Sequence, residues 1–286
     1  MSFEIISANY NNAKFLANFF DSIINSTATP SSIIIVDDCS KDNSVDIIKS
    51  YSNKINIKLI VNEKNVGFAN SLNIALNELK EPYFARLDPD DAVFPERFSI
   101  QLNFLQQNPE IDIVGTNVNY ILNGESKHSS DVLLDERVVN DKIRKGILPV
   151  IHGSIMGKSE LLQDFRYDQA LVPAEDYDLF AYAISRGYRI ANLVDALTYV
   201  TIHANSVSND LKFLTIKKRF SLAKKYFGFN KSYLGSYFEY VHLVYYRKYL
   251  FETTVLKYFY LCVSAAAMPL KVLKKVTRKV FSVVNL

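Results

Sequence analysis

The sequence predicts an α/β fold with a mostly parallel sheet, and two observations support that prediction. First, short apolar runs rich in β-branched residues alternate with segments whose apolar side chains recur at helical spacing. Second, polar residues rarely interrupt the apolar runs, as in parallel strands that are covered on both faces. Strands that are joined through helices form parallel sheets, and ligands bind such sheets at the carboxyl ends of the strands.

Four strands and four helices are expected in turn over the first 108 residues. The strands are expected at 3–8, 32–36, 57–61 and 83–85, and the helices around 15–23, 45–48, 69–79 and 95–108. A polar cluster follows each strand, at residues 9–12, 37–38, 62–67 and 88–91. Because the carboxyl ends of parallel strands share one edge of the sheet, we expect the four clusters to converge there.

The alternation becomes less regular after residue 108. A half-exposed strand is expected at 111–120, a mobile polar loop at 123–131, a helix at 135–145 and a strand at 151–156. A further helix opens at Ala174 and ends at Gly187, and the last strands are expected at 190–193 and 197–202. The regular repeat is therefore confined to the first part of the chain.

The composition is that of a globular protein, but charge is divided unevenly along the chain. Of 286 residues, 49% are hydrophobic and 22% are charged, which allows one large core or two smaller ones. Residues 1–210 hold 18 Lys and Arg against 28 Asp and Glu, whereas residues 211–286 hold 15 against 2. The net charge of +3 hides an acidic part and a basic part, which we expect to have different partners.

The cysteines and the apolar runs indicate a cytoplasmic protein. Cys39 and Cys262 are the only cysteines and lie outside any zinc motif, so neither a zinc site nor a disulfide framework is expected. The first residues lack the basic start and apolar region of a signal peptide. The longest uncharged run near the end, 258–270, has 13 residues, fewer than the roughly 20 that a membrane-spanning helix needs.

An acidic block follows the fourth expected strand and is the first candidate site. Asp88, Asp90 and Asp91 stand directly after this strand. Carboxylate oxygens at this spacing suit Mg²⁺ or Mn²⁺, hard ions that keep coordination positions open for phosphate oxygens. The same residues also fit a turn with an N-cap ahead of the helix that Pro95 opens. The convergence of the four polar clusters favours the metal site.

A series of motifs in residues 1–208 resembles the inverting glycosyltransferases of family 2. In chain order the motifs are Asn9-Tyr10-Asn11, Val36-Asp37-Asp38-Cys39-Ser40 with Asp42, Asn65-Val66-Gly67, Ala85-Arg86-Leu87-Asp88-Pro89-Asp90-Asp91, Pro95-Glu96-Arg97, Glu175-Asp176-Tyr177-Asp178, Gly187-Tyr188-Arg189 and His203-Ala204-Asn205-Ser206-Val207-Ser208. Each motif is weak alone, and their common order and spacing carry the resemblance. It implies a GT-A fold, a Rossmann-like sheet that binds a nucleotide-sugar donor and a divalent ion, here followed by a helical extension.

The resemblance assigns the donor site to residues at the strand ends. It implies that Asp38 accepts a hydrogen bond from the nucleobase, that Tyr10 packs beside the base, and that Asp88 lies near the ribose. Asn65 belongs to the same donor site. The base that the resemblance implies is uracil, whose imide N–H can donate to a carboxylate, so the expected donor is a UDP-sugar. The alternative is that Asp37 and Asp38 only cap the following helix.

The cofactor expected from the resemblance is Mn²⁺ or Mg²⁺. Asp90, which also belongs to the donor site, would be the direct metal ligand, and His203 would complete the metal shell. The ion would neutralise the charge that grows on the nucleoside diphosphate as it leaves C1 of the sugar. In general, a lone histidine after an apolar strand is more often a packed or capping residue, which is the alternative for His203.

The resemblance assigns the general base to Asp176, which takes the proton from the acceptor hydroxyl. At a helix N-terminus this carboxylate is held ionised and loses basicity, whereas the neighbouring acids Glu175 and Asp178 act in the opposite direction. Glu175 and His152 are candidates for supporting the base or the acceptor. The alternative is that Glu175, Asp176 and Asp178 are first-turn acids with no further task.

Two positions depart from the family pattern. The family often has an arginine two residues before the histidine, where Thr201 stands in this chain. It also often has a proline after a histidine, where His152-Gly153 stands. Diphosphate and acceptor contacts at these positions are therefore not carried over from the family.

The expected organisation is a catalytic domain and a tail. The catalytic domain covers 1–208, with a nucleotide-sugar-binding half at 1–120 and an acceptor-binding half at 121–208, and a basic, aromatic, helical tail covers 209–286. In 211–286 the mixture of lysines with aromatic residues suits an anionic membrane interface. No nucleic-acid motif accompanies these basic residues, and no nucleic-acid partner is expected. The alternative is a solvated helical cap on the catalytic domain.

Residues and resemblance together predict a hexosyl- or N-acetylhexosaminyl-transferase, peripheral at the inner face of the cytoplasmic membrane. Its expected partners are a UDP-sugar and a lipid-linked or growing polysaccharide, as in O-antigen or capsule synthesis. A nucleotidyltransferase also joins an α/β sheet to metal-binding carboxylates, but a Gly-rich phosphate loop followed by lysine is missing from the sequence. The third hypothesis is a non-catalytic nucleotide-sugar-binding or membrane scaffold protein, against which intact Asp90, Asp176 and His203 argue.

Overall fold

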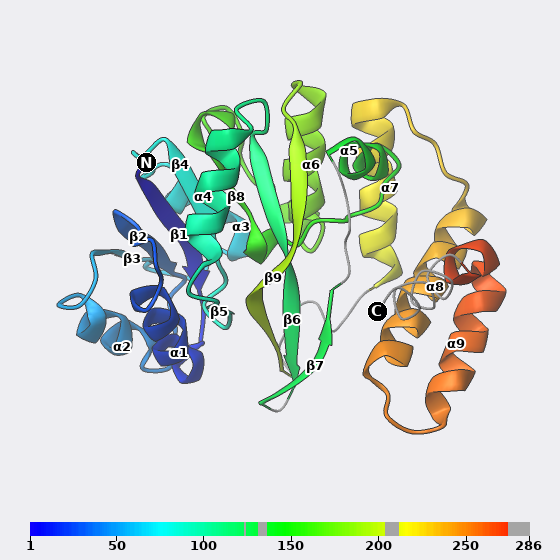
Figure 1. The fold of residues 1–286 in the computed structure, drawn as a ribbon, viewed down its shortest axis with the longest axis horizontal. Coiled ribbons are helices and arrows are strands. Elements are labelled where there is room, and N and C mark those ends of the chain that lie inside the picture. Colours follow the sequence, from blue (N-terminus) through cyan, green and yellow to red (C-terminus); the bar gives the residue numbers. More distant parts are fainter. Residues whose placement is uncertain (123, 131–135, 204–211, 274–286) are drawn as a thin grey trace.

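One sheet runs through the protein (Figure 1). The computed structural model describes residues 1–122, 124–130, 136–203 and 212–273. The strands are β1 (Phe3–Asn9), β2 (Ser32–Asp37), β3 (Ile57–Val61), β4 (Tyr83–Arg86), β5 (Ala92–Val93), β6 (Ile113–Leu122), β7 (Glu125–Ser129), β8 (Met156–Lys158) and β9 (Ile190–Ile202). They follow the order β3-β2-β1-β4-β8-β6-β9-β5, and β7 pairs with β6.

Helices cover both faces of this sheet. They are α1 (Ala13–Ile24), α2 (Ser44–Tyr51), α3 (Phe68–Leu76), α4 (Arg97–Gln107), α5 (Glu136–Arg144), α6 (Glu175–Ser185), α7 (Phe213–Phe227), α8 (Tyr233–Phe251) and α9 (Leu256–Ala267), with 3-10 helices at His152–Ser154, Ser159–Leu162 and Gln169–Leu171. Side chains alternate across each strand, so Ile5 and Ile33 join one core with α1 and α4, whereas Ile6 and Ile34 join the other core with α3 and α6. This architecture confirms the predicted α/β fold class.

The carboxyl ends of the first parallel strands converge on one edge, as predicted. β1 pairs in parallel with β2 and β4, and β2 pairs in parallel with β3. Asn9, at the end of β1, donates from Nδ2 to Asp37 Oδ2, at the end of β2, over 2.7 Å. The Ser7 hydroxyl donates to the Leu87 carbonyl just beyond β4 over 2.8 Å. These buried bonds hold the loops after β1, β2 and β4 together.

The middle of the sheet differs from the expected pattern. β8 pairs antiparallel with β4 and β6, and β6 pairs in parallel with β9. Residues 113–118 are buried, although their alternation predicts a half-exposed strand, because both faces of β6 are covered: Ile113 joins one core and Val114 joins the other. The expected loop is wrong for Glu125–Ser129, which form β7 antiparallel to β6. Residues 123 and 131 of that loop lie outside the described residues.

Two further segments correct the sequence-based boundaries. The expected strand at 151–156 begins as the 3-10 helix His152–Ser154, and pairing in the sheet starts only at Met156. The two strands expected at 190–193 and 197–202 form the single strand β9, whose register against β6 shifts around Asn117. A bulge of this kind lets polar residues interrupt the apolar pattern without ending the strand.

Helix α7 packs on the sheet-containing part, whereas α8 and α9 pair with each other farther from β1 to β3 (Figure 1). Leu222 and Ala223 of α7 are buried in the core that contains α3 and α6. These three helices form the predicted helical extension. The motif residues 204–208 and the basic residues at 274–279 lie outside the described residues. In the ranges that the structure covers, no helix combines the length and the apolar character needed to cross a membrane.

Helix α7 packs closely on Gly146. The φ of Gly146 is +77°, and a Cβ there would lie 2.3 Å from Cδ1 of Phe220 on α7. At Gly187 φ is +92°, but a Cβ would meet nothing within 4 Å. We predict that Gly146→Ala lowers the free energy of unfolding by about 1–3 kcal/mol more than Gly187→Ala, because only the former adds a clash to the backbone strain. Denaturant unfolding measures both variants, and equal losses would contradict this packing.

Candidate active site

Hydrogen bonds between the loops after β1 and β2 build one wall of the candidate site. Asp37 is buried and accepts from Asn9 Nδ2, from the Ser40 N–H and from the Ser40 hydroxyl over 2.7–2.9 Å. Asn11 has a φ of +55° and donates its N–H to Ser40 Oγ over 2.9 Å. Tyr10 stands between these fixed residues and is 46% exposed. An aromatic ring that is exposed on a fixed backbone can stack on a ligand ring.

The Asp38 carboxylate holds the loop after β3. It is buried and accepts from the N–H groups of Val66 and Gly67, each at 2.8 Å, and from Asn62 Nδ2 at 2.9 Å. Asp38 does not cap α2, whose N-cap position is Asn43. A carboxylate offers about four acceptor positions, so Asp38 keeps one beyond these three bonds. Its contact with a nucleobase stays a prediction.

The loop after β3 faces a residue that sequence reasoning missed. A Cβ at Gly67, where φ is +93°, would lie 2.5 Å from the Gln169 side chain. Gln169 Oε1 accepts from the Ala69 N–H at 3.0 Å, at the start of α3. Asn65 is exposed on the same loop and donates to the Asp38 carbonyl at 3.4 Å. The available signal for Gln169 was Gly67, because glycine is the residue that allows another segment to approach the backbone closely.

Two carboxylates of the acidic block have cationic or imidazole partners. Arg86 is fully buried and donates from Nη2 to Asp88 Oδ1. Asp90 Oδ2 lies 2.9 Å from His203 Nε2. The side chains of Asp88 and Asp90 remain 30% and 22% exposed, respectively. The structure therefore brings Asp90 and His203 together, as the predicted metal site requires.

Asp91 has a structural role in the same block. It is buried and accepts from the Thr201 N–H on β9 at 2.9 Å. Burial and then the charges of Asp90 and Asp88 raise the pKa of Asp91 well above its usual value. Asp91 does not cap α4, whose N-cap position is Glu96. It ties the acidic block to β9, next to the strand end that presents His203.

The donor atoms of the block fit a divalent cation. Burial and the charge of Asp88 raise the pKa of Asp90, against the lowering effect of its hydrogen bond with His203. A cation stabilises carboxylates that are crowded in this way, and carboxylate and imidazole are both ligands of Mn²⁺. No group of three or more His, Cys, Asp or Glu within the described ranges is arranged to hold a metal by itself. Asp90 and His203 would supply two ligands and leave positions for phosphate oxygens.

The departure from the family pattern at His152-Gly153 lies against the acidic block. A Cβ at Gly153 would lie 3.0 Å from Asp88 Oδ2. His152 is buried, with Nε2 2.8 Å from the Tyr167 hydroxyl. Burial, followed by the charge of Arg86, lowers the pKa of His152 well below its usual value. His152 is therefore a neutral imidazole bound to Tyr167, and its support of the base or the acceptor stays a prediction.

The candidate base Asp176 is the second residue of α6, and a charge of the acidic block influences its pKa. Burial is the largest influence on its pKa and raises it, the charge of Arg219 lowers it, and the charge of Asp88 raises it. The Tyr177 N–H donates to Asp176 Oδ1 at 2.6 Å. Asp176 keeps partial exposure to solvent. The negative charge of Asp88, on the donor side, is thus one of the influences on the pKa of the candidate base.

The adjacent acid Glu175 is more deeply enclosed. It is 9% exposed, and its Oε2 is buried without a hydrogen-bond partner in the described part of the chain. Burial, followed by the charges of Asp176 and Asp88, raises the pKa of Glu175 to about 7. Asp178, the third acid, accepts from the Tyr226 hydroxyl at 2.9 Å. The three first-turn acids therefore have three different environments.

Arg86 is a site residue to which sequence reasoning gave no role. Its side chain is fully buried, and Nε and Nη1 have no hydrogen-bond partner among the residues described. The guanidinium lies 5.4 Å from the centroid of the Phe68 ring. The available signal was a cation at the end of an apolar strand, because a buried guanidinium requires carboxylates nearby.

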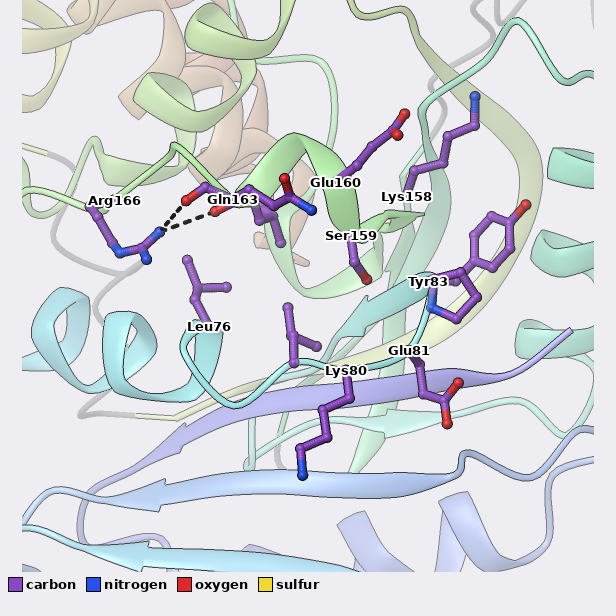
Figure 2. Close-up of a pocket in the computed structure, with 12 residues that line it drawn as sticks. Leu76, Lys80, Glu81, Tyr83, Lys158, Ser159, Glu160, Gln163 and Arg166 are labelled. Carbon is purple, nitrogen blue, oxygen red and sulfur yellow. Dashed lines mark hydrogen bonds between the residues drawn. The ribbon is translucent and has the colours of Figure 1, made fainter.

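A hollow of about 460 Å³ lies at the amino end of β4, where Tyr83 begins the strand, and not at the acidic block (Figure 2). Arg166 at its rim donates to the Gln163 carbonyl at 3.0 Å. Lys158 donates to Asp112 at 2.8 Å. Because these cations serve the protein itself, we assign the hollow no role in the chemistry.

Glu175 offers a test of the buried acids through the pH dependence of stability. Its pKa is about 7 in the folded protein against an ordinary 4.5, so the folded state binds its proton more tightly and stability falls as the pH rises through that window. We predict that Glu175→Gln removes this fall and is more stable than the wild type near pH 8, by up to about 3 kcal/mol. Unfolding between about pH 5 and pH 8 measures the effect.

The exposed carboxylate Asp141 provides the control for this measurement. Asp141→Asn should follow the wild-type dependence of stability on pH, because its side chain is solvated in both states. The same fall in the Glu175→Gln variant would contradict the buried environment of Glu175.

Comparison with known proteins identifies the family. Residues 4–165 match Glycosyl transferase family 2. An uncharacterized glycosyltransferase of Methanocaldococcus jannaschii is 31% identical over 192 residues, which cover 65% of this chain and 66% of that protein. EpsE of Bacillus subtilis, named as a glycosyltransferase, is 30% identical over 209 residues, which cover 68% of this chain and 70% of EpsE. The chain thus spans about two thirds of the length of these relatives.

Solved structures share the fold at low sequence identity. TarS 1–349 of S. aureus, in complex with UDP-GlcNAc, aligns with a TM-score of 0.62 at 20% identity, over 94% of this chain and 72% of that one. The mannosyltransferase PcManGT of Pyrobaculum calidifontis, in complex with GDP-Man and Mn²⁺, aligns with a TM-score of 0.61 at 16% identity, over 93% and 73%. The predicted GT-A fold and the predicted enzyme class, a glycosyltransferase, are confirmed. The chain therefore belongs to glycosyl transferase family 2.

Proposed function

We propose that the chain transfers one sugar from a UDP-sugar to a hydroxyl of a lipid-linked or growing polysaccharide, with inversion at C1. The observation that carries this proposal is that the 3-10 helix His152–Ser154 lies against both the acidic block and α6, since a Cβ at Gly153 would lie 3.0 Å from Asp88 Oδ2 and the ring of His152 lies 6.4 Å from the ring of Phe180. It indicates that donor-side carboxylates and a partly exposed base share one site. Direct displacement needs this arrangement, since donor and acceptor must be held together with a base beside the attacking oxygen.

The nucleotide half of the donor would lie across the loops after β1, β2 and β3. The exposed ring of Tyr10 offers a stacking surface, and Asp38 keeps one acceptor position for an imide N–H. Asn65 is exposed beside them. The complexes of TarS with UDP-GlcNAc and of PcManGT with GDP-Man support a nucleoside-diphosphate donor. The acceptor-only carboxylate favours uracil, and the transferred unit would be a hexose or an N-acetylhexosamine.

The diphosphate half would lie at the acidic block. Asp90 and His203 would hold Mn²⁺ or Mg²⁺, which when bound offsets the charge that develops on the leaving diphosphate. Arg86 fixes the orientation of Asp88, whose free oxygen can accept from a ribose hydroxyl. The complex of PcManGT with GDP-Man and Mn²⁺ supports a metal in this fold.

Asp176 would act as the general base. Its Oδ1 accepts from the Tyr177 N–H, which orients the carboxylate and leaves Oδ2 for the acceptor hydroxyl. The acceptor oxygen forms its bond to C1 while the bond from C1 to the diphosphate oxygen breaks, and the hydroxyl proton passes to Asp176. A single displacement of this kind inverts the configuration at C1.

A donor screen scored by UDP release tests the proposed function. The wild type should release UDP from at least one UDP-sugar in the presence of Mn²⁺ and a polyprenyl-diphosphate sugar acceptor. Asp176→Asn should lower kcat by about 10²–10⁴-fold, because the acceptor proton then has no base. Asp178→Asn is the matched control on the same turn, since Asp178 bonds to Tyr226, and it should keep most activity. Near-normal turnover by a folded Asp176→Asn variant would remove Asp176 as the base.

The tail would bring the enzyme to its acceptor at the inner face of the cytoplasmic membrane. Large apolar side chains are exposed on α8, on α9 and beside them, namely Tyr233, Leu234, Tyr237, Phe238, Val255, Leu256, Tyr258, Phe259, Leu270 and Leu273. Lys257 lies 5.1 Å from the ring of Tyr258, and Lys248 lies 5.5 Å from the ring of Tyr260. Exposed aromatic residues with lysines beside them suit the headgroup region of anionic lipid.

Vesicle binding tests the proposed membrane contact. We predict that the double substitution Tyr258→Ser with Phe259→Ser weakens co-sedimentation with phosphatidylglycerol vesicles by about tenfold or more, because both side chains are more than half exposed on α9 and lose apolar area. Val194→Ser is the control, since Val194 is 55% exposed on β9 and is not part of the tail. Equal binding by the two variants would exclude α9 as the contact.

A further inference from the structure

Helix α7 carries the cation of Arg219 to the start of α6. Arg219 Nη2 donates to the Gly146 carbonyl at 2.9 Å, and its guanidinium carbon lies 5.8 Å from the centroid of the Tyr177 ring. Tyr177 directly follows Asp176, and its hydroxyl donates to the Ile143 carbonyl at 2.5 Å. Arg219 is therefore held by a carbonyl and by the fixed ring of the residue that follows the candidate base.

Further contacts fix α7 in this position. The ring of Phe220 packs on Gly146, where a Cβ would clash with it. Lys218 Nζ donates at 2.7 Å to each of the carbonyls of Ala170 and Val172, in the segment that leads into α6. The cation of Arg219 thus lies between the hydrogen bonds of Lys218 and the packed ring of Phe220, so its distance from α6 is set by packing.

The charge of Arg219 opposes the effect of burial on Asp176. Burial is the largest cause that raises the pKa of Asp176, and the charge of Arg219 is the largest cause that lowers it. Asp88 of the acidic block also raises this pKa, and among the described residues Glu175 and Tyr167 are titratable groups that interact with Asp176 as well. The interaction is reciprocal, since Asp176 raises the pKa of Arg219. Opposite charges enclosed together favour the ionised form of each.

We propose that Arg219 is a positioning residue for the transfer reaction, which keeps the Asp176 carboxylate ionised and thereby sets the lower pH limit of catalysis. This inference rests on the proposed role of Asp176 as the base. It makes α7 part of the catalytic unit, although α7 lies beyond the motifs and within the segment expected to be a tail. The active site is then complete only when α7 is packed against Gly146 and α6.

The dependence of kcat/KM on pH tests this role. UDP release is measured from about pH 5 to pH 9 for the wild type, Arg219→Gln and Arg219→Lys, with donor, acceptor and Mn²⁺ at fixed saturation ratios. Arg219→Gln should lose about tenfold at the acidic end and approach the wild type toward pH 9, because only the protonated fraction of Asp176 is inactive. Arg219→Lys should restore most of the acidic activity, since it keeps the charge.

Two further variants separate this role from a structural one. Lys224→Gln removes an exposed cation from the same helix and should leave the pH profile unchanged. Arg219→Met removes the charge but keeps an unbranched apolar stem, and it replaces Arg219→Gln if that variant does not fold. A loss of activity that is equal at every pH would mean that Arg219 only supports the fold, and it would overturn the inference.

Asp176→Asn distinguishes failure of the inference from failure of the proposed function. If Asp176→Asn is inactive and the charge-removing variants of Arg219 keep the wild-type profile, the inference fails and the proposed function stands. If Asp176→Asn is as active as the wild type, the proposed function itself fails.

Discussion

The site depends on carboxylates that are placed at the enclosed carboxyl ends of parallel strands. Water solvates such groups poorly, so each needs a donor or a counter-charge from the protein. The structure supplies fixed partners to four of them: Ser40 and Asn9 to Asp37, backbone N–H groups to Asp38, Arg86 to Asp88 and the Thr201 N–H to Asp91. These bonds organise the loops, and the loops in turn position the side chains left for the substrate.

The groups with spare bonding capacity are the ones to which we assign chemistry. Asp90 has His203 as its partner and stays partly exposed, and Asp176 uses one oxygen on a backbone N–H and keeps contact with solvent. Glu175, directly beside Asp176, is less exposed, and burial raises its pKa to about 7. Adjacent acids with different environments can hold different protonation states at one pH, which a general base beside a second carboxyl requires.

Local patterns in the sequence were sufficient for the first half of the fold. The apolar runs of β1 to β4 follow the same pattern, and each run is followed by a polar cluster. Parallel pairing brings the ends of these strands together. β7 was missed because its sequence, Glu-Ser-Lys-His-Ser, has no apolar alternation and its strand exists only through pairing with β6. Residues 151–156 predict a strand that begins instead as the 3-10 helix His152–Ser154, because a short segment with apolar ends does not distinguish a strand from a tight turn.

The site was predictable only in part, because many of its contacts join segments that lie far apart in the sequence. Asp90 and His203 were brought together by the resemblance to a family, since nothing local connects residues so far apart in the chain. The roles of Gln169, Arg86 and Arg219 depend on contacts between distant segments, and no spacing rule encodes them. Packing of α7 on Gly146 is what links the helical extension to the base, and only the folded structure reveals it.

The most direct test of the account is a calorimetric titration of Mn²⁺ into the protein with and without UDP. The account holds that Asp90, His203 and a nucleoside diphosphate form one metal site. It predicts tight binding of Mn²⁺ by the wild type only when UDP is present, and binding weaker by about tenfold or more for Asp90→Asn, as expected for loss of a ligand. Binding of Mn²⁺ and UDP by a folded Asp90→Asn variant with wild-type affinity would contradict the account.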